Sequence, residues 1–159
     1  MTVCYLGMGG NLGDSLQVFK DVIIEISNSD VIDMQKSSSF YKTKPLDDES
    51  QPEYLNAVLR IVTDLSSYEL LDYLQALEHK FGRVRTEKQW DSRTLDLDIL
   101  LFGEQRISDR RLHVPHKEMQ YRDFVLYPLY EIAPELIIPG LGDLKKLISQ
   151  CENRGMTKI

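Results

Sequence analysis

One stretch of the sequence restricts the possible folds more than any other. From residue 95 to residue 102 the chain reads Leu-Asp-Leu-Asp-Ile-Leu-Leu-Phe, with apolar and acidic residues alternating at first. Successive side chains of a strand point to opposite faces, so this pattern predicts a half-buried strand. Asp96 and Asp98 would then project from one face, about 6.6 Å apart along the strand. The residues expected on the core side are Leu95, Leu97, Ile99 and Leu101.

Two carboxylates on one strand face repel each other and cannot be buried without partners. A divalent cation removes that repulsion, and Mg²⁺ is bound by a few carboxylates together with waters and phosphate oxygens. Two such ions roughly 3.5–4 Å apart can bracket a phosphoryl group during transfer. The alternative is an exposed strand edge with two incidental aspartates, but aspartate is depleted in strands. We therefore favour Asp96 and Asp98 as ligands of two Mg²⁺ ions.

The segment before this strand is basic, although the chain as a whole is acidic. The 159 residues carry a formal net charge of −6, yet residues 79–93 hold five basic side chains against two acidic ones. Arginine can bind phosphate oxygens through two parallel N–H groups. A solvated loop would explain Arg83 and Arg85 alone. Together with Arg93, so close to the acidic pair, they indicate a site for a phosphorylated small molecule.

The order of predicted elements indicates an α+β fold in a single domain spanning residues 1–159. A capping box at Ser66–Glu69 opens one of the helices. Residues 43–52 are too few for a crossover helix, so the strands on either side should pair antiparallel. The order corresponds to a ferredoxin-like βαββαβ core, an antiparallel sheet with helices packed on it. Strands are predicted at 3–6, 31–42, 54–63 and 95–102, helices from about residues 15 and 66, and short C-terminal helices broken by Pro128, Pro134 and Pro139.

The remaining patterns mainly exclude classes of protein. The glycines at 7, 9, 10 and 13 fit neither a dinucleotide fingerprint nor a P-loop. We expect them to form a tight turn after the first strand, with close approach of a ligand as the alternative. No apolar stretch is long enough to span a bilayer, and no secretory signal is visible. Cys4 and Cys151 match no zinc spacing, which predicts reduced thiols in a cytoplasmic protein.

Short motifs between residues 9 and 134 form a specific combination. They include Gly-x-Asn-Leu-Gly-Asp at 9–14, Gln-Pro-Glu-Tyr-Leu-Asn-Ala at 51–57, Arg-Thr-Leu-Asp-Leu-Asp at 93–98, Val-Pro-His at 114–116 and Arg-x-Phe-Val-Leu at 122–126. In these motifs the chain resembles the 6-hydroxymethyl-7,8-dihydropterin pyrophosphokinases of folate biosynthesis. The resemblance implies transfer of pyrophosphate from ATP to the hydroxymethyl group of the dihydropterin, with release of AMP.

The resemblance also implies a role for individual residues. Asp96 and Asp98 would hold two Mg²⁺ ions, and Arg83 and Arg93 would stabilise the charge on the transferring group. Tyr54 and Phe124 would sandwich the pterin. The full set of pterin-binding residues would be Thr43, Leu46, Tyr54, Asn56 and Phe124. The residues lining the ATP site would be Gln75, Glu78, Arg85, Trp90, Ile99, Arg111, His113, His116 and Arg122.

The sequence departs from the family pattern just before Arg93. Gln89, Asp91 and Ser92 replace a basic residue, a glycine and a proline, so we expect weaker ATP binding than is usual in the family. We expect residues 83–94 to close over ATP.

Other activities stay open at this point. A ferredoxin-like RNA-binding module would need stacked aromatic residues and a basic sheet face, and the acidic chain argues against it. A palm-type two-metal nucleotidyl transferase would also use strand carboxylates but would release pyrophosphate. A catalytically silent nucleotide-binding relative is a further alternative. We expect a monomer that binds ATP and the dihydropterin, with no nucleic-acid or membrane partner.

Overall fold

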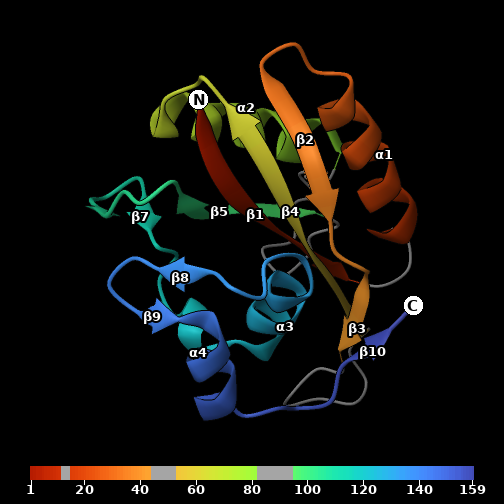
Figure 1. Ribbon diagram of the computed structural model, residues 1–159. Coiled ribbons are helices and arrows are strands. Elements are labelled where there is room, and N and C mark those ends of the chain that lie inside the picture. The colour runs from red at the N-terminus through yellow and green to blue at the C-terminus, as the bar shows by residue number, and fades with distance from the viewer. Residues whose placement is uncertain (12–14, 44–52, 82–94) are drawn as a thin grey trace.

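A computed structural model describes residues 1–11, 15–43, 53–81 and 95–159. Its centre is an antiparallel sheet in the strand order β10-β3-β4-β1-β5, and β2 also pairs with β4 (Figure 1). The two central strands are β1 (Thr2–Asn11) and β4 (Tyr54–Thr63). The other strands of this sheet are β2 (Ile32–Ser37), β3 (Tyr41–Thr43), β5 (Asp96–Phe102) and β10 (Thr157–Lys158).

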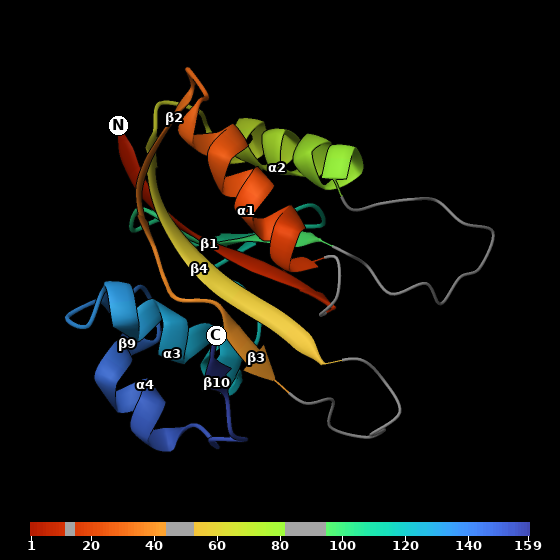
Figure 2. The same ribbon diagram turned by 90° about the vertical axis from the view of Figure 1, so that its right-hand side faces the viewer.

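Helices cover both faces of the sheet (Figure 2). On one face lie α1 (Ser15–Ser27) and α2 (Ser67–Phe81), and on the other lie α3 (Asp123–Ile132) and α4 (Leu144–Gln150). Two short hairpins and a 3₁₀ turn complete the described part. They are β6 (Ile107–Ser108) with β7 (His113–Val114), β8 (Ile137–Ile138) with β9 (Gly142–Asp143), and Met119–Tyr121.

The alternation in β4 explains why helices pack on both faces. Every second residue, from Leu55 to Ile61, is buried in a cluster with α1 and α2. Val58 points the other way and joins the cluster formed with α3 and α4. The strand predicted at residues 54–63 is therefore confirmed, and so is a mixed α and β fold built on an antiparallel sheet.

The capping box that opens α2 is also confirmed. The backbone N–H of Ser66 donates to the Glu69 carboxylate at 2.9 Å, and the N–H of Glu69 donates to the Ser66 hydroxyl at 3.1 Å. These reciprocal bonds satisfy two amides that have no partner within the helix. Helix α2 therefore starts where the sequence predicted.

The expected strand over residues 31–42 is wrong in one respect, because the structure has two strands there. Between β2 and β3, the backbone N–H of Ser38 donates to the Val58 carbonyl at 2.8 Å, and the Ser38 hydroxyl accepts from the Val58 N–H at 2.9 Å. The Ser38 hydroxyl thus replaces a backbone carbonyl as the acceptor of the Val58 N–H. Both strands still pair with β4, but the register moves by one residue within β2, after Met34, and by one more residue between β2 and β3.

The prediction that Leu101 lies on the same face of the strand as Leu97 and Ile99 is also wrong. Leu6 pairs with Ile99 whereas Tyr5 pairs with Leu101, so Leu100 is an extra residue in β5. Such a bulge turns the following side chain to the opposite face. Leu101 consequently packs with Leu100 in the α3 and α4 cluster, not on the side of Leu97 and Ile99.

Contrary to the expectation, Pro128 does not break the C-terminal helix. It lies inside α3, which continues to Ile132. Proline lacks the N–H that would bond to the carbonyl four residues earlier, a loss that buried packing has to offset. Val125, Leu126 and Leu129 supply that packing by burying the helix against β4.

The two cysteines are not bonded to each other. Cys4 lies in the core, and burial raises the pKa of its thiol to about 12. None of the described helices has the length and apolar character needed to cross a membrane.

Glu131 joins α3 to the segment between β2 and β3. Its carboxylate accepts hydrogen bonds from the Ser39 backbone N–H at 2.9 Å, from the Ser39 hydroxyl at 2.8 Å, and from the Tyr41 hydroxyl. Burial raises the pKa of Glu131, but these hydrogen bonds outweigh burial and leave the pKa below its usual value. The ionised carboxylate therefore stabilises the folded state.

The pH dependence of this contribution can be measured. A carboxyl group with a depressed folded-state pKa stabilises the fold above its unfolded pKa, about 4.3, and the effect is lost as pH falls through the folded pKa. We expect Glu131→Gln to lower the free energy of unfolding by roughly 1 kcal/mol at pH 7, since the group is partly exposed. Urea unfolding should show this difference shrinking toward zero below about pH 4. The exposed Glu135→Gln is the control, and a pH-independent loss in Glu131→Gln would contradict the assignment.

Candidate active site

A cavity of about 310 Å³ lies on the α3 side of the sheet. Its walls come from β1, β3, β4, β5 and the start of α3, elements that are distant in sequence but adjacent in the sheet. The backbone around residue 155 completes the lining. Because both the acidic pair and the aromatic residues singled out from the sequence line it, this cavity is the candidate active site.

Four predicted pterin-binding residues meet in the cavity. Thr43 ends β3, Tyr54 and Asn56 lie on the same face of β4, and Phe124 is in the first turn of α3. The Asn56 side chain is 9% exposed, and its Nδ2 lies 3.5 Å from the Thr43 hydroxyl. Aromatic rings beside a fixed amide suit a flat heterocycle with hydrogen-bonding edges. The fifth predicted residue, Leu46, lies outside the described residues.

The glycines of β1 form part of the cavity wall, and the predicted turn is wrong for them. Gly7, Gly9 and Gly10 lie inside β1, which runs to Asn11. A Cβ on Gly9 would lie 3.3 Å from the Asn56 Oδ1, and one on Gly7 would lie 3.3 Å from the Leu100 side chain. Glycine at these positions keeps space for the side chains of β4 and β5. Gly13 lies outside the described part.

The two aspartates project into the same cavity, as their spacing predicted. Asp96 pairs with Gly9 and Asp98 with Gly7, so both carboxylates stand over a stretch of β1 that has no side chains there. The Asp98 side chain is 51% exposed, and its Oδ2 lies 3.8 Å from the His116 Nε2. The described residues contain no group of three or more His, Cys, Asp or Glu suited to a metal. Two carboxylates at a solvent-accessible edge match Mg²⁺, which takes its other ligands from water and phosphate.

Glu78 fixes the strand that carries these aspartates. It is 6% exposed on α2, and its carboxylate accepts the backbone N–H of Leu97 at 3.0 Å. Leu97 lies between Asp96 and Asp98, so this bond holds the strand at the point where both carboxylates leave it. The geometry gives Glu78 a positioning role, while its predicted contact with ATP stays a prediction.

Two further predicted ATP residues also reach the cavity. Arg122 precedes α3, stacks over the Phe124 ring at 5.7 Å and pairs with Glu118 at 3.3 Å. His116 is held by its backbone N–H, which donates to the Leu100 carbonyl at 2.9 Å. Both side chains add positive or protonatable groups beside the acidic pair.

The other described ATP residues lie away from this cavity. Arg111 pairs with Asp72 of α2 and stacks over the Tyr68 ring at 5.7 Å. His113 borders a neighbouring cavity, with its Nδ1 3.0 Å from the Pro115 carbonyl. Gln75 is exposed on α2, and the Ile99 side chain is buried in the α1 and α2 cluster. The remaining predicted residues, Arg83, Arg85, Trp90 and Arg93, lie outside the described residues together with the departures at 89, 91 and 92.

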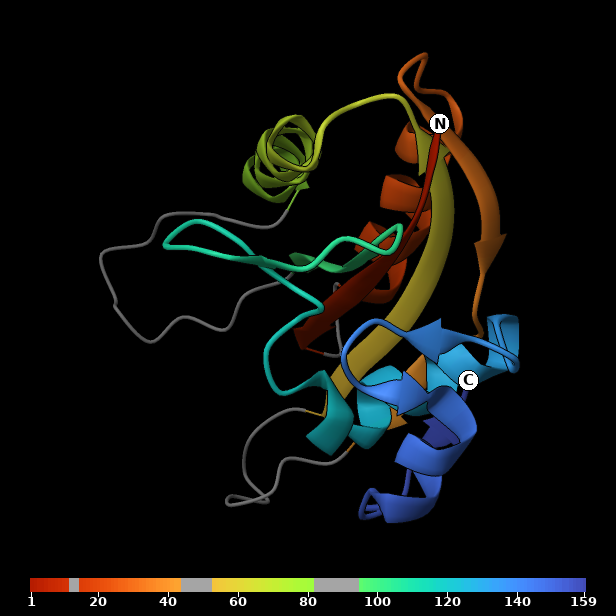
Figure 3. The same cartoon turned by 60° about the vertical axis from the view of Figure 1, so that its left-hand side comes forward.

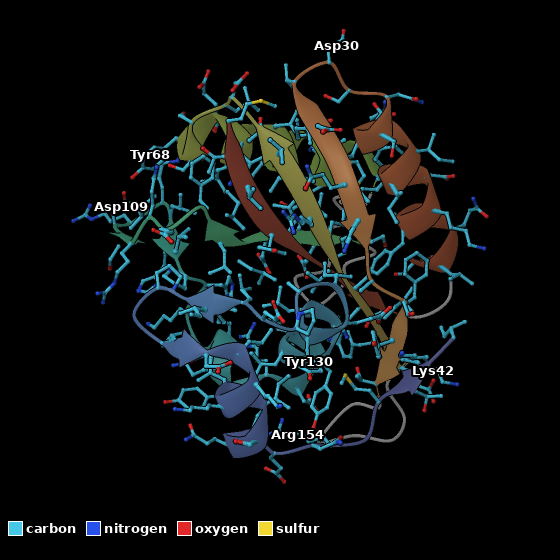
Figure 4. All side chains as sticks on the ribbon, viewed as in Figure 1. Asp30, Lys42, Tyr68, Asp109, Tyr130 and Arg154 are labelled. Carbon is cyan, nitrogen blue, oxygen red and sulfur yellow. The ribbon has the colours of Figure 1, made fainter. Side chains whose placement is uncertain are left out.

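Side chains bond the β6–β7 hairpin, which carries Arg111, to α2; Figure 3 shows the hairpin as the teal loop below this helix. The Tyr68 hydroxyl donates to the Asp109 carboxylate, and these two side chains lie next to each other in Figure 4. This hydrogen bond lowers the pKa of Asp109 and raises that of Tyr68. The hairpin is therefore anchored beside α2, with Arg111 turned toward that helix.

Part of the cavity lining carries no signal in the sequence. Asp123, Arg154 and Gly155 also border the cavity. The Asp123 side chain is 3% exposed and accepts the backbone N–H of Arg154 at 2.8 Å. No motif marks residues 154 and 155, so only the fold shows that they reach the cavity.

Comparison with known proteins identifies the family. A family model described as 7,8-dihydro-6-hydroxymethylpterin-pyrophosphokinase (HPPK) matches residues 5–134. The chain belongs to this family. Its relatives include a 2-amino-4-hydroxy-6-hydroxymethyldihydropteridine pyrophosphokinase of Haemophilus influenzae, 42% identical over 159 residues that cover 100% of this chain and 99% of the relative. One of the same name from Pseudomonas aeruginosa is 39% identical, over 98% of this chain and 95% of the relative.

Solved structures of fused proteins share the pyrophosphokinase fold. An HPPK-DHPS in complex with substrates matches 94% of this chain at 12% identity with a TM-score of 0.72. Wild-type HPPK-DHPS of Plasmodium falciparum matches 94% at 12% identity with a TM-score of 0.71. This chain spans about 43% and 41% of those two chains. The family and the relatives' names confirm the expected activity, pyrophosphoryl transfer to hydroxymethyldihydropterin in folate biosynthesis.

The positioning role of Glu78 predicts a loss of stability. Glu78→Ala leaves the buried Leu97 N–H without this acceptor, so we expect the free energy of unfolding to fall by about 1–3 kcal/mol. Glu78→Gln keeps a carbonyl acceptor and should lose less. Urea unfolding of both variants measures the difference. Equal stability of Glu78→Ala and the unaltered protein would contradict the role.

Proposed function

We propose that this chain uses ATP and Mg²⁺ to transfer pyrophosphate to the hydroxymethyl group of 6-hydroxymethyl-7,8-dihydropterin, releasing AMP. The observation that carries the proposal is one cavity that joins two carboxylates on a strand face to an aromatic and amide pocket. An aromatic pocket alone would serve a binding protein, and two carboxylates alone would serve many metal enzymes. An aromatic pocket and two carboxylates in the same cavity fit a phosphoryl transfer to a flat heterocyclic alcohol.

The pterin-binding roles rest on the lining of the cavity. Phe124 offers a ring on the α3 wall, and Tyr54 offers another at the end of β4, where 41% of the residue is exposed. Stacking between aromatic rings orients a planar ligand. Asn56, and Thr43 beside it, can then exchange hydrogen bonds with the pterin edge. We assign Leu46 to the same site from the family resemblance.

The nucleotide roles follow from charge. Asp96 and Asp98 would hold two Mg²⁺ ions, which would neutralise triphosphate charge and align the β-phosphate when bound. Arg122 and His116 border the same space and can contact phosphate oxygens. The resemblance adds Arg83, Arg85 and Arg93 as further phosphate ligands. It also adds Gln75, Glu78, Trp90, Ile99, Arg111 and His113 to the nucleotide site.

In the proposed reaction, the pterin hydroxyl oxygen attacks the β-phosphorus of ATP in line with the departing AMP. A bond forms from that oxygen to the β-phosphorus, and the bond from the β-phosphorus to the oxygen bridging it to the α-phosphorus breaks. AMP leaves with the electron pair of the broken bond, and the hydroxyl proton passes to solvent. No side chain has to act as a nucleophile. The chain lowers the barrier by fixing both reactants and by placing charge where it develops.

We also propose a specific topology, location and oligomeric state for the protein. The order β5-β1-β4, with β2 and β3 beyond β4, fits a ferredoxin-like βαββαβ core. We propose that residues 1–159 act as one cytoplasmic, monomeric domain on small-molecule substrates. Gel filtration with light scattering tests the monomer.

Product analysis tests the function directly. The protein is incubated with ATP, Mg²⁺ and the reduced pterin alcohol, and the nucleotides are separated by chromatography. We expect AMP to appear only when the pterin is present. Release of pyrophosphate from ATP would instead support a nucleotidyl transferase, and unchanged ATP would indicate a silent relative.

The acidic pair gives a direct mutational prediction. Asp98→Asn removes one negative charge from the cavity with little change of shape, so we expect kcat/KM to fall at least about 100-fold, or roughly 2.7 kcal/mol of transition-state stabilisation. Asp96→Asn should behave alike. The matched control is Asp143→Asn, because Asp143 caps the remote helix α4 and asparagine caps equally well. Activity near that of the control would remove the metal role.

The pterin pocket gives a prediction on substrate affinity. Phe124→Ala removes the ring on the α3 wall, so we expect the KM for the pterin to rise about tenfold, while the KM for ATP changes little. Tyr121→Ala serves as control, since Tyr121 is near Phe124 in sequence but 71% exposed. Steady-state kinetics with each substrate varied separates the two constants. A change in the KM for ATP alone would contradict the assignment.

A further inference from the structure

We propose that Arg154 and Gly155, held in place by the pairing of residues 157–159 with β3, form one wall of the dihydropterin site and help to set the affinity for the pterin. The proposal rests on the function proposed above and concerns a segment that no sequence motif marks. Arg154 and Gly155 border the same cavity as the glycines of β1. They approach it from the end of the described chain, which crosses below α3 and returns to the sheet (Figure 1).

The first anchor of this segment lies inside the cavity. Asp123 is 3% exposed at the start of α3, and its Oδ2 accepts the Arg154 backbone N–H at 2.8 Å. The next residue of α3 is Phe124, the proposed stacking ring. The bond therefore joins the backbone at residue 154 to the turn of helix that presents the ring.

The second anchor joins the segment to β3, another element of the cavity wall. Strand β10 pairs with β3, with Thr157 opposite Lys42 and Lys158 opposite Tyr41. The backbone N–H of Ile159 donates to the Phe40 carbonyl at 3.0 Å. Strand β3 ends at Thr43, a cavity residue, and Figure 4 shows Lys42 beside β10.

A side-chain contact strengthens this second anchor. The Lys158 ammonium lies 5.8 Å from the centre of the Tyr41 ring. Tyr41 donates to Glu131 of α3, and the positive charge of Lys158 helps to lower the pKa of Glu131. The end of the segment is thereby connected to both β3 and α3.

Between the two anchors the chain has to turn beside the cavity. Gly155 adopts φ +84°, a left-handed conformation that side chains disfavour, although a Cβ there would meet no atom within 4 Å. The positive φ, not lack of space, thus requires glycine. The segment that runs from the Asp123 bond to β3 thus contributes Arg154 and Gly155 to the lining of the cavity that Tyr54, Asn56 and Phe124 also line.

The experiment compares three variants with the unaltered protein. One ends at Asn153, the second is Gly155→Ala, and the third is Gly142→Ala. Gly142 is the matched control because it has φ +95° and equally open surroundings, but lies in the β8–β9 hairpin and does not line the cavity. Binding of 6-hydroxymethylpterin is measured by its fluorescence, binding of a non-hydrolysable ATP analogue by calorimetry, and folding by thermal unfolding.

We expect the shortened chain to bind the pterin about tenfold more weakly and the ATP analogue with unchanged affinity. Gly155→Ala should weaken pterin binding about threefold, whereas Gly142→Ala should lose similar thermal stability without this effect. Pterin affinity unchanged in Gly155→Ala and in the folded shortened chain would overturn the inference, as would equal weakening in both alanine variants. If the shortened chain does not fold, the two alanine variants decide. Failure of the unaltered protein to bind pterin or form AMP would refute the proposed function itself.

Discussion

The antiparallel pairing of β1 with both β4 and β5 is the constraint on which the site depends. It brings Asp96 and Asp98 of β5 within one strand of Asn56 on β4, although the chain between β4 and β5 includes a whole helix. The intervening strand β1 carries Gly7 and Gly9 in the matching register, so no side chain separates the acidic pair from the amide. A slip of one residue in either pairing would turn one set of side chains into the opposite core.

The two faces of the sheet differ in what covers them. On the α1 and α2 face, side chains such as Phe19, Leu59 and Leu74 fill the core and hold the strands in place. Glu78 reaches from that side and bonds to the β5 backbone. On the other face the packing of α3 and α4 stops short of the end of the sheet, and the space left there is the cavity. The described part of the α1 and α2 face is therefore core, whereas the other face combines the core formed with α3 and α4 with the cavity.

The sequence predicted local features well where they depend on a single capping side chain or on the two-residue alternation of a strand. The Ser66–Glu69 cap, the strand at residues 54–63 and the shared face of Asp96 and Asp98 all follow from local geometry. Tertiary contacts decided the rest: Ser38 interrupts the predicted long strand by bonding to Val58, and an extra Leu100 turns Leu101 around. The β1 glycines look like a turn in sequence, because only the register shows which side chains they face. Asp123 and residues 154–155 could not be predicted, since their contacts join distant parts of the chain.

The central claim is that metal and nucleotide bind at this end of β5, facing the pterin pocket. Paramagnetic broadening by Mn²⁺, added with a non-hydrolysable ATP analogue, reports distance from the metal to each backbone amide in an NMR spectrum. We expect strong loss of signal at Gly9, Asp96, Asp98 and His116, and none at Ile148 of α4. Sharp signals at Asp96 and Asp98, with broadening confined to another surface, would contradict it.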